Sequence, residues 1–172
     1  MSAAITLAAL NSASEEDFVR VLGGVFEHSP WVAQGVLGQR PFASVQALHR
    51  AMTECIQRAG RDAWLTLIRA HPELAGKAAV RGELTPESSS EQAGAGLANC
   101  SPEEFATLTS LNQAYREKFG FPFILAVRGY DRAGIIEQFQ RRLGLAPDAE
   151  MAENLAQIYR IGRLRLDDLI RE

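Results

Sequence analysis

The sequence predicts an all-α fold: a helical bundle with one extended, buried connector at residues 121–127. Apolar residues recur at helical spacing through most of the chain, and residues that begin or end helices separate these segments. Only residues 121–127, Phe-Pro-Phe-Ile-Leu-Ala-Val, resemble a strand, and a lone strand has no partner with which to pair. A length of 172 residues fits one domain, so residues 1–172 are expected to form a single domain.

Capping residues place the predicted helices along the chain. Ser14 is expected to cap the first, because acidic residues fill the turn that follows it. Ser101 and Glu104 form a capping box, and Gly120 ends the helix that they begin. The predicted helices cover residues 15–27, a short segment at Trp31, 45–59 after Ser44, 62–70, a segment after Ser88–Ser90, 102–119, 131–143 and 148–171. Residues 71–87 are expected to form a loop. The helix after Ser101 is expected to bury Phe105, Leu108, Leu111, Tyr115 and Phe119.

Composition argues against several classes of protein. Eighteen Lys and Arg against twenty-one Asp and Glu give a formal net charge of −3, without the basic excess typical of nucleic-acid binding. No apolar run approaches the ~18 residues of a membrane span, and the first basic residue is Arg20, which is unlike a secretory signal. Cys55 and Cys100 have no CxxC partner or nearby histidine set, so both are expected to be reduced, buried thiols in a cytoplasmic protein without a metal site.

His71 is the first of three positions where the residue type goes beyond what a structural bundle requires. It stands at the predicted end of a helix, because Pro72 disfavours helical geometry at the residue before it. A helix C-terminus favours the protonated imidazole, which suits acid–base chemistry near neutral pH. A histidine that merely caps the helix is the alternative.

Glu91 lies in the second segment, Ser88-Ser89-Ser90-Glu91-Gln92-Ala93-Gly94-Ala95-Gly96-Leu97. The serines are expected to cap a helix, yet glycine in its first turns weakens it by up to ~1 kcal/mol per residue relative to alanine. Glycine there indicates close approach by another element or by a ligand. The alternative is that Glu91 is a first-turn carboxylate that interacts only with the helix dipole.

Arg165 falls at the edge of the apolar face of the last predicted helix, at about 100° per residue. That face holds Met151, Leu155, Ile158, Gly162, Leu166 and Leu169. Arg160 and Arg163 are expected to point away from it. Because an unpaired buried charge is costly, Arg165 needs a partner on the buried side. The alternative is a side chain that reaches solvent or pairs with Asp168.

Four segments share their order and spacing with one known family. They read His71-Pro72-Glu73-Leu74-Ala75-Gly76-Lys77, Ser88-Ser89-Ser90-Glu91-Gln92, Phe119-Gly120-Phe121-Pro122-Phe123-Ile124 with Ala126-Val127-Arg128-Gly129, and Arg160-Ile161-Gly162-Arg163-Leu164-Arg165-Leu166. Together they resemble the 2-oxo-4-hydroxy-4-carboxy-5-ureidoimidazoline (OHCU) decarboxylase family. Ser29-Pro30-Trp31 and Arg40-Pro41-Phe42 resemble its early segment, so the resemblance spans nearly the whole chain.

The resemblance implies an all-α, homodimeric enzyme of urate breakdown that needs no cofactor and converts OHCU to (S)-allantoin with loss of carbon dioxide. It implies that His71, Glu91 and Arg165 carry the reaction. Substrate contacts are implied for Pro72, Ser88 and its neighbours Ser89 and Ser90, Gln92, and the main chain of Phe123, Ile124, Leu125, Ala126 and Val127. Gly162 departs from the family, which more often has alanine there, and this difference is expected to loosen the last helix.

The substrate explains why no cofactor is expected, since its imine carbon accepts the electrons that the carboxylate leaves behind. The protein must orient the carboxylate, stabilise an enol-like intermediate and protonate one face of the adjacent carbon. His71 suits the proton transfer, Glu91 steers that imidazole or holds ureido N–H groups, and Arg165 offers a two-pronged contact to an oxygen. Connector amides outside any sheet would add a polar cradle. The alternatives are a non-catalytic helical interaction module and a same-fold enzyme for a related ureido acid.

Overall fold

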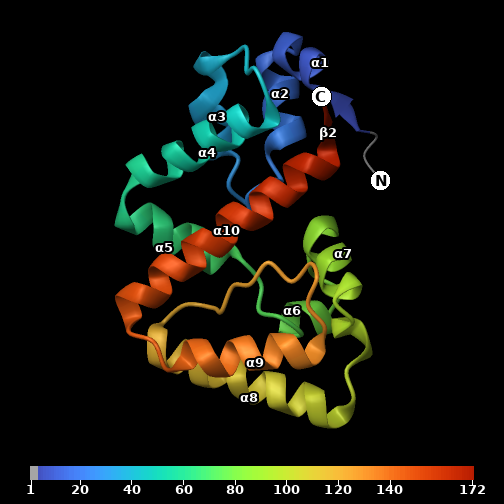
Figure 1. Cartoon of the computed structure of the whole chain (residues 1–172), viewed down its shortest axis with the longest axis vertical. Helices are drawn as coiled ribbons and strands as arrows, with labels where there is room; N and C mark the ends of the chain where they lie inside the picture. Colours follow the sequence, from blue (N-terminus) through green and yellow to red (C-terminus); the bar gives the residue numbers. More distant parts are fainter. Residues whose placement is uncertain (1–3) are drawn as a thin grey trace. The chain divides into compact units, whose positions relative to one another are not determined.

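The computed structural model describes residues 4–172 and confirms the predominantly helical class (Figure 1). The described elements are β1 (Ile5–Thr6), α1 (Leu7–Ser12), α2 (Glu15–Leu22), α3 (Trp31–Val36), the 3-10 turn Leu37–Gln39, α4 (Val45–Ala59), α5 (Arg61–Ala70), α6 (Lys77–Val80), α7 (Pro86–Gly94), the 3-10 turn Leu97–Asn99, α8 (Pro102–Phe119), α9 (Arg132–Leu143), α10 (Pro147–Leu169) and β2 (Ile170–Arg171).

The chain divides into two compact units. One contains the described residues up to Leu67 together with Tyr159–Glu172, and the other contains Ile68–Ile158. Both α5 and α10 contribute residues to each unit. The single domain expected over residues 1–172 stays a prediction.

The first unit is built from α1 to α4 with the ends of the chain. Its core contains Leu10, Phe18, Leu22, Phe26, Val32, Leu48, Met52 and Ile56. The predicted cap Ser14 is confirmed, since its hydroxyl accepts a hydrogen bond from the Asp17 N–H at 3.1 Å. Ser44 caps α4 in the same way, with the Ala47 N–H at 3.0 Å from its hydroxyl oxygen.

Two helix ends in this unit differ from the prediction. The helix expected over residues 15–27 ends at Leu22, because Gly23 and Gly24 follow and glycine is a poor helix former. The helix expected to reach residue 171 ends at Leu169. The last residues instead form β2, which pairs in parallel with β1 and places Ile170 opposite Ile5.

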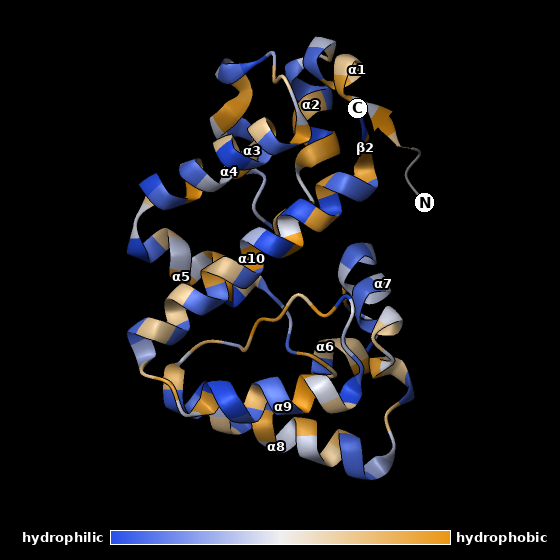
Figure 2. Ribbon diagram, viewed as in Figure 1, coloured by the Kyte–Doolittle hydropathy of each residue, from blue (hydrophilic) through white to orange (hydrophobic). Residues whose placement is uncertain are grey.

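The second unit surrounds the connector at residues 121–127 with α8, α9 and the first part of α10. Tyr115 and Phe123 lie in an aromatic core, where the Phe123 ring stacks on Phe139 with 3.7 Å between centroids. The connector has no helical or sheet structure and is buried except for the half-buried Pro122, so its prediction is confirmed. Figure 2 shows it as a largely hydrophobic segment.

Other parts of the second unit correct the sequence-based expectations. The expected loop at 71–87 contains the short helix α6, and Thr85, rather than the serines, caps α7. The capping box of Ser101 and Glu104 is confirmed. Phe105 was expected to point inward but is 41% exposed, and it lines an open groove with Val80.

The two thiols are free, as predicted, but both are half-buried rather than buried. Burial raises the pKa of the Cys100 thiol, and the Glu104 carboxylate adds to the shift. No helix within residues 4–172 combines the length and apolar character that crossing a membrane requires.

Candidate active site

His71 lies directly after the C-terminus of α5, where the sequence places it. Its backbone N–H donates to the carbonyl oxygen of Ile68 at 3.1 Å, which closes the last turn, and Pro72 prevents any continuation. The residue is only 7% exposed. The helix end is the setting that the sequence predicts for His71, and its burial is an additional finding of the structure.

The loop after Pro72 is held by two amide side chains from neighbouring helices. Gln92 on α7 accepts from the Ala75 N–H at 3.0 Å and donates to the Glu73 carbonyl oxygen at 3.3 Å. Asn112 on α8 donates to the Leu74 carbonyl oxygen at 2.9 Å. Ala75 has a φ of 50°, a left-handed conformation that costs free energy unless such contacts hold it. Gln92, expected to contact substrate, therefore also fixes the loop that follows His71.

Asn112 was not identified from the sequence, although a signal is present. It lies four residues after Leu108 and three before Tyr115, and all three positions are buried on one face of α8. A polar residue within a buried apolar stripe needs hydrogen-bond partners, so this pattern indicates a side chain that holds another segment.

α7 begins earlier than the sequence analysis placed it. The Thr85 hydroxyl accepts from the Ser88 N–H at 3.2 Å, and Pro86 occupies the first helical position, where its missing N–H costs least. Ser88, Ser89 and Ser90 are thus inside the helix, and the expectation that they cap it is wrong.

The position of Glu91 in α7 excludes one of its two interpretations. It lies in the C-terminal half of the helix, so it is not a first-turn carboxylate, and the dipole alternative is wrong. Ser88, Glu91 and Gln92 have the spacing i, i+3, i+4 and share one face. Ser88 and Gln92 are buried and Glu91 is half-buried. Ser89 and Ser90 are exposed on other faces, so helical geometry groups only Ser88 of the three serines with Glu91 and Gln92.

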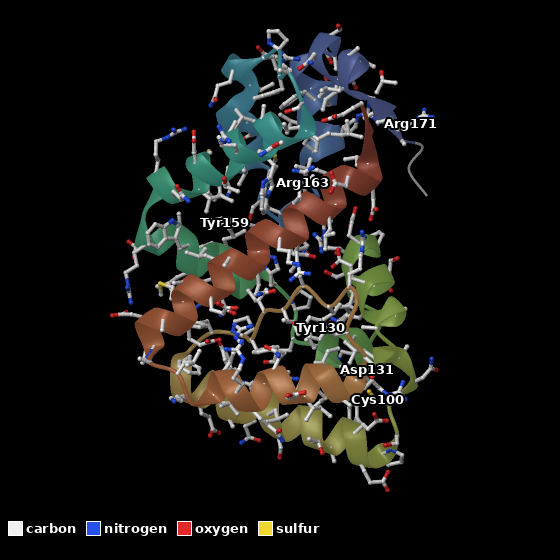
Figure 3. The ribbon with its side chains drawn as sticks, in the orientation of Figure 1. Cys100, Tyr130, Asp131, Tyr159, Arg163 and Arg171 are labelled. Carbon is white, nitrogen blue, oxygen red and sulfur yellow. The ribbon has the colours of Figure 1, made fainter. Side chains whose placement is uncertain are left out.

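Of the two glycines after Glu91, Gly96 has a close neighbour, whereas a Cβ atom at Gly94 would meet nothing within 4 Å. Gly96 has a φ of 80°, and a Cβ atom there would lie 2.8 Å from Nη1 of Arg132. That guanidinium donates to the Gly96 carbonyl oxygen at 3.1 Å and to Glu104 at 2.8 Å. Of the two explanations offered for these glycines, close approach by another element therefore accounts for Gly96. Asp131, labelled in Figure 3, caps the helix that carries Arg132.

The connector is bound by side chains of α9 and α10. The Ile124 N–H donates to Asn154 at 3.0 Å, and the Ala126 N–H donates to Gln157 at 3.0 Å. Arg142 donates to the Ile124 carbonyl oxygen at 2.5 Å. The cradle of amides expected from the sequence is thus partly satisfied by the protein itself.

A fully buried polar network supports this attachment. Arg142 and Glu150 form an ion pair whose side chains are both 0% exposed, and the Tyr115 hydroxyl donates to Glu150 at 2.6 Å. Asn154 accepts from Arg142 at 2.6 Å. Burial raises the pKa of Tyr115, so this residue remains a neutral donor. This network was not predicted from the sequence, although Arg142 follows Phe139 by three residues on the apolar face of α9.

Arg165 belongs to the first unit and is 6% exposed. Its Nη2 donates to Oε1 of Glu27, itself 1% exposed, at 2.9 Å. Its Nη1 donates to the carbonyl oxygens of Gly24 at 3.1 Å and Val25 at 3.4 Å. The alternative in which Arg165 reaches solvent is wrong, and the carboxylate that sequence reasoning missed is Glu27.

Its neighbours on α10 differ in exposure. Arg160 is exposed, as predicted. Arg163, labelled in Figure 3, is half-buried and pairs with Asp167 at 2.9 Å. Arg165 is thus the arginine of this segment that is buried, which agrees with the helical-wheel argument.

The described residues 4–172 contain no group of three or more His, Cys, Asp or Glu side chains that could hold a metal ion. The titratable side chains near His71 and Glu91 therefore do not form a metal centre of that kind.

Comparison with known proteins identifies relatives along almost the whole chain. The family described as OHCU decarboxylase matches residues 11–167. A 2-oxo-4-hydroxy-4-carboxy-5-ureidoimidazoline decarboxylase of Halalkalicoccus jeotgali is 39% identical over 96% of this chain and 92% of its own length. A crystal structure of (S)-allantoin synthase superposes with a TM-score of 0.79 at 28% identity, covering 96% of this chain and 54% of that chain. An OHCU decarboxylase crystallised in the presence of (S)-allantoin shares the fold, with a TM-score of 0.68 at 23% identity over 91% of this chain and 98% of that chain.

Proposed function

Because the chain belongs to the OHCU decarboxylase family, we propose that it decarboxylates OHCU to (S)-allantoin in urate breakdown. The observation that carries the proposal is the family match over residues 11–167, which includes every residue expected to take part in the reaction. The protein is then a carboxy-lyase.

The reaction follows from the bonds of the substrate. The bond between C4 and its carboxyl group breaks, carbon dioxide leaves, and the electron pair forms a double bond between C4 and C5. The former imine nitrogen takes the displaced electron pair and a proton, which gives an enol at C4. Loss of the hydroxyl proton and addition of a proton to one face of C5 then give allantoin. One proton is consumed for each carboxylate lost.

His71 is the proposed proton carrier between the hydroxyl group and C5. An imidazole with a pKa of about 6.5 when unperturbed both accepts and donates near neutral pH. Its attachment to the end of α5 and the bonds that fix the following loop restrict the directions from which it can deliver a proton. A fixed direction of delivery is what a one-handed product requires.

The other proposed roles follow the chemistry of each group. Glu91 orients the imidazole or accepts from ureido N–H groups, and Ser88 on the same face of α7 offers a further hydrogen bond. Arg165 binds a carboxylate or carbonyl oxygen of the substrate. Pro72 and the main chain of residues 123–127 complete the proposed contacts.

The proposed dimer and the lack of a cofactor rest on the family resemblance, and the proposed location rests on the free thiols of Cys55 and Cys100. The protein is proposed to be a cytoplasmic homodimer that requires no cofactor. Light scattering after gel filtration tests the dimer, and cell fractionation tests the location. Full activity after exhaustive chelation is the expected result for a cofactor-free reaction, and a loss of rate that one added metal restores would contradict it.

Freshly prepared OHCU provides the test of the activity. Its absorbance is expected to decay faster with the protein than without it, and circular dichroism is expected to show one-handed allantoin. A protein that leaves the decay rate unchanged would favour the helical interaction module instead. Faster turnover of a different ureido acid would favour a same-fold enzyme with another substrate.

A further inference from the structure

The attachment of the connector follows an alternating pattern. Its bonds to side chains of α9 and α10 run from Asn154 Nδ2 to the Pro122 carbonyl oxygen (3.1 Å), from the Ile124 N–H to Asn154 (3.0 Å), from Arg142 to the Ile124 carbonyl oxygen (2.5 Å), and from the Ala126 N–H to Gln157 (3.0 Å). All four backbone groups belong to the even-numbered residues 122, 124 and 126.

This pattern is typical of an extended chain. In such a chain the N–H and C=O groups of one residue point to the same side, and those of the next residue point to the opposite side. The even-numbered residues therefore direct their backbone groups at α9 and α10. The backbone groups of Phe123, Leu125 and Val127 point away from these helices.

The spacing of the two amide side chains matches the connector. Asn154 and Gln157 are three residues apart on α10, which is about 4.5 Å along a helix, whereas residues 124 and 126 are about 6.6 Å apart along an extended chain. The additional methylene group of Gln157 helps to span this difference. A shift of the connector by one residue would direct the odd-numbered backbone groups at α10 instead.

Asn154 is itself fixed by the buried network, because Arg142 and the Tyr115 hydroxyl both contact its amide group. Asn154 is 0% exposed. Gln157 is half-buried and also donates to Glu153, one turn earlier on α10, at 3.1 Å. Gln157 can therefore be changed without disturbing the Arg142 network.

The Val127 carbonyl oxygen accepts from the Tyr130 N–H at 2.9 Å, so of the Val127 backbone groups only the N–H remains for a ligand. We propose that Asn154 and Gln157 are positioning residues that set the register of the connector, so that Leu125 offers its backbone groups, and Val127 its N–H, to the substrate. The proposal rests on the proposed function, in which the main chain of residues 123–127 contacts OHCU. It distinguishes positions within that segment, because the N–H groups of Ile124 and Ala126 are already bonded to α10.

The test compares Gln157→Leu, which removes the acceptor, with Gln157→Glu, which retains an acceptor oxygen and is made in the Glu153→Gln background so that two carboxylates do not face each other. Glu153→Gln is the matched control, because it changes the other partner of Gln157 and leaves the connector bond in place. Hydrogen exchange of the peptide containing residues 122–127 is measured with kcat/KM for OHCU and the melting temperature.

In Gln157→Leu, exchange in the connector is expected to accelerate about tenfold to a hundredfold, because a buried donor loses its acceptor. A fall of about tenfold or more in kcat/KM is expected, and the melting temperature should fall only by the few degrees that one unpaired buried donor costs. Gln157→Glu and Glu153→Gln are expected to keep both quantities within about threefold of wild type. Recovery of kcat/KM by a side chain that restores only the acceptor oxygen would show that Gln157 positions the connector rather than stabilising the whole fold.

Three results would overturn the proposal: unchanged exchange in Gln157→Leu, accelerated exchange with wild-type kcat/KM, or a Gln157→Glu variant as impaired as Gln157→Leu. Failure of the proposed function would appear separately, as a wild-type protein that does not convert OHCU. In that event the exchange data still decide whether Gln157 sets the register of the connector.

Discussion

Replacing Arg165 by lysine separates its structural role from its proposed contact with substrate. Lysine keeps the positive charge next to Glu27 but loses the planar, two-pronged donor. Arg160 is the matched control, because it is exposed on the same helix and undergoes the same chemical change. Arg165→Lys is expected to reduce both stability and activity, and Arg160→Lys neither.

The structural cost follows from the acceptors that Arg165 satisfies. A lysine can keep the contact with Glu27, but the carbonyl oxygens of Gly24 and Val25 lose their donor. Val25 is buried, so its carbonyl oxygen cannot readily bond to water, whereas Gly24 is exposed. One buried acceptor left without a partner costs about 1–3 kcal/mol. At about 2–4 °C per kcal/mol for a chain of this size, the melting temperature is expected to fall by about 2–12 °C.

The catalytic cost is expected to be of similar size. A charge-assisted hydrogen bond contributes about 1.5–3 kcal/mol, which corresponds to a fall in kcat/KM of about tenfold to a hundredfold. A protein with a typical stability of about 5–15 kcal/mol remains folded at 25 °C after a loss of about 2 kcal/mol. Rates at that temperature therefore report on the site rather than on unfolding.

Both variants are assayed for OHCU turnover at one salt concentration and melted under circular dichroism. Equal, small effects at positions 165 and 160 would refute the reasoning. A lower melting temperature with unchanged kcat/KM would show that Arg165 serves only to hold Glu27 and the segment around it.

Four further changes test other parts of the molecule. His71→Asn is expected to lower kcat by about 10²–10⁴-fold while helix content and melting temperature stay near wild type, as kinetics and circular dichroism will show. Glu91→Ala is expected to lower turnover more than the melting temperature, and the reverse order would mean that this carboxylate is structural. Gly162→Ala places a Cβ atom 2.7 Å from the buried Phe26 ring, so thermal melts should show a free energy of unfolding lower by about 1–3 kcal/mol. Adding Phe26→Leu removes the clash, so the double variant should recover part of that loss. Burial lowers the pKa of His49, so the folded state favours the neutral ring. The free energy of unfolding is therefore expected to fall as the pH drops below about 6.5. Melting curves of His49→Gln should lack that part of the pH dependence.

Features set by neighbouring residues could be predicted from the sequence. Ser14, Ser44 and Ser101 cap helices through bonds to an N–H three residues away, so the pattern that predicts them contains both partners. His71 follows a helix end that Pro72 makes predictable. The cap of α7 was not predicted, although its signal was local. Pro86 at the first helical position indicates Thr85 as the cap more strongly than it indicates the serines that follow.

Contacts between distant residues could not be predicted in this way. Glu27 and Arg165 are 138 positions apart, and neither periodicity nor capping relates them. The contact between Phe26 and Gly162 likewise joins residues that are far apart in the sequence. The sequence shows only a glycine on the apolar face of α10, whereas the structure shows the Phe26 ring occupying the space that a Cβ atom would need. The glycine is thus matched to a large neighbour, and the expectation that it only loosens the helix is incomplete.

The buried Arg142 and Arg165 both donate hydrogen bonds to the backbone of an irregular segment. Residues 25–27 after α2 and most of the connector at 121–127 are buried but irregular, so helix or sheet bonds do not satisfy their backbone groups. In each unit an arginine donates to a carbonyl oxygen of the segment, Arg165 to Val25 and Arg142 to Ile124. A buried glutamate offsets the charge of each arginine, which would otherwise be costly to bury. Removing either glutamate should therefore disturb the backbone of an irregular segment before it disturbs any helix, and hydrogen exchange would detect this order.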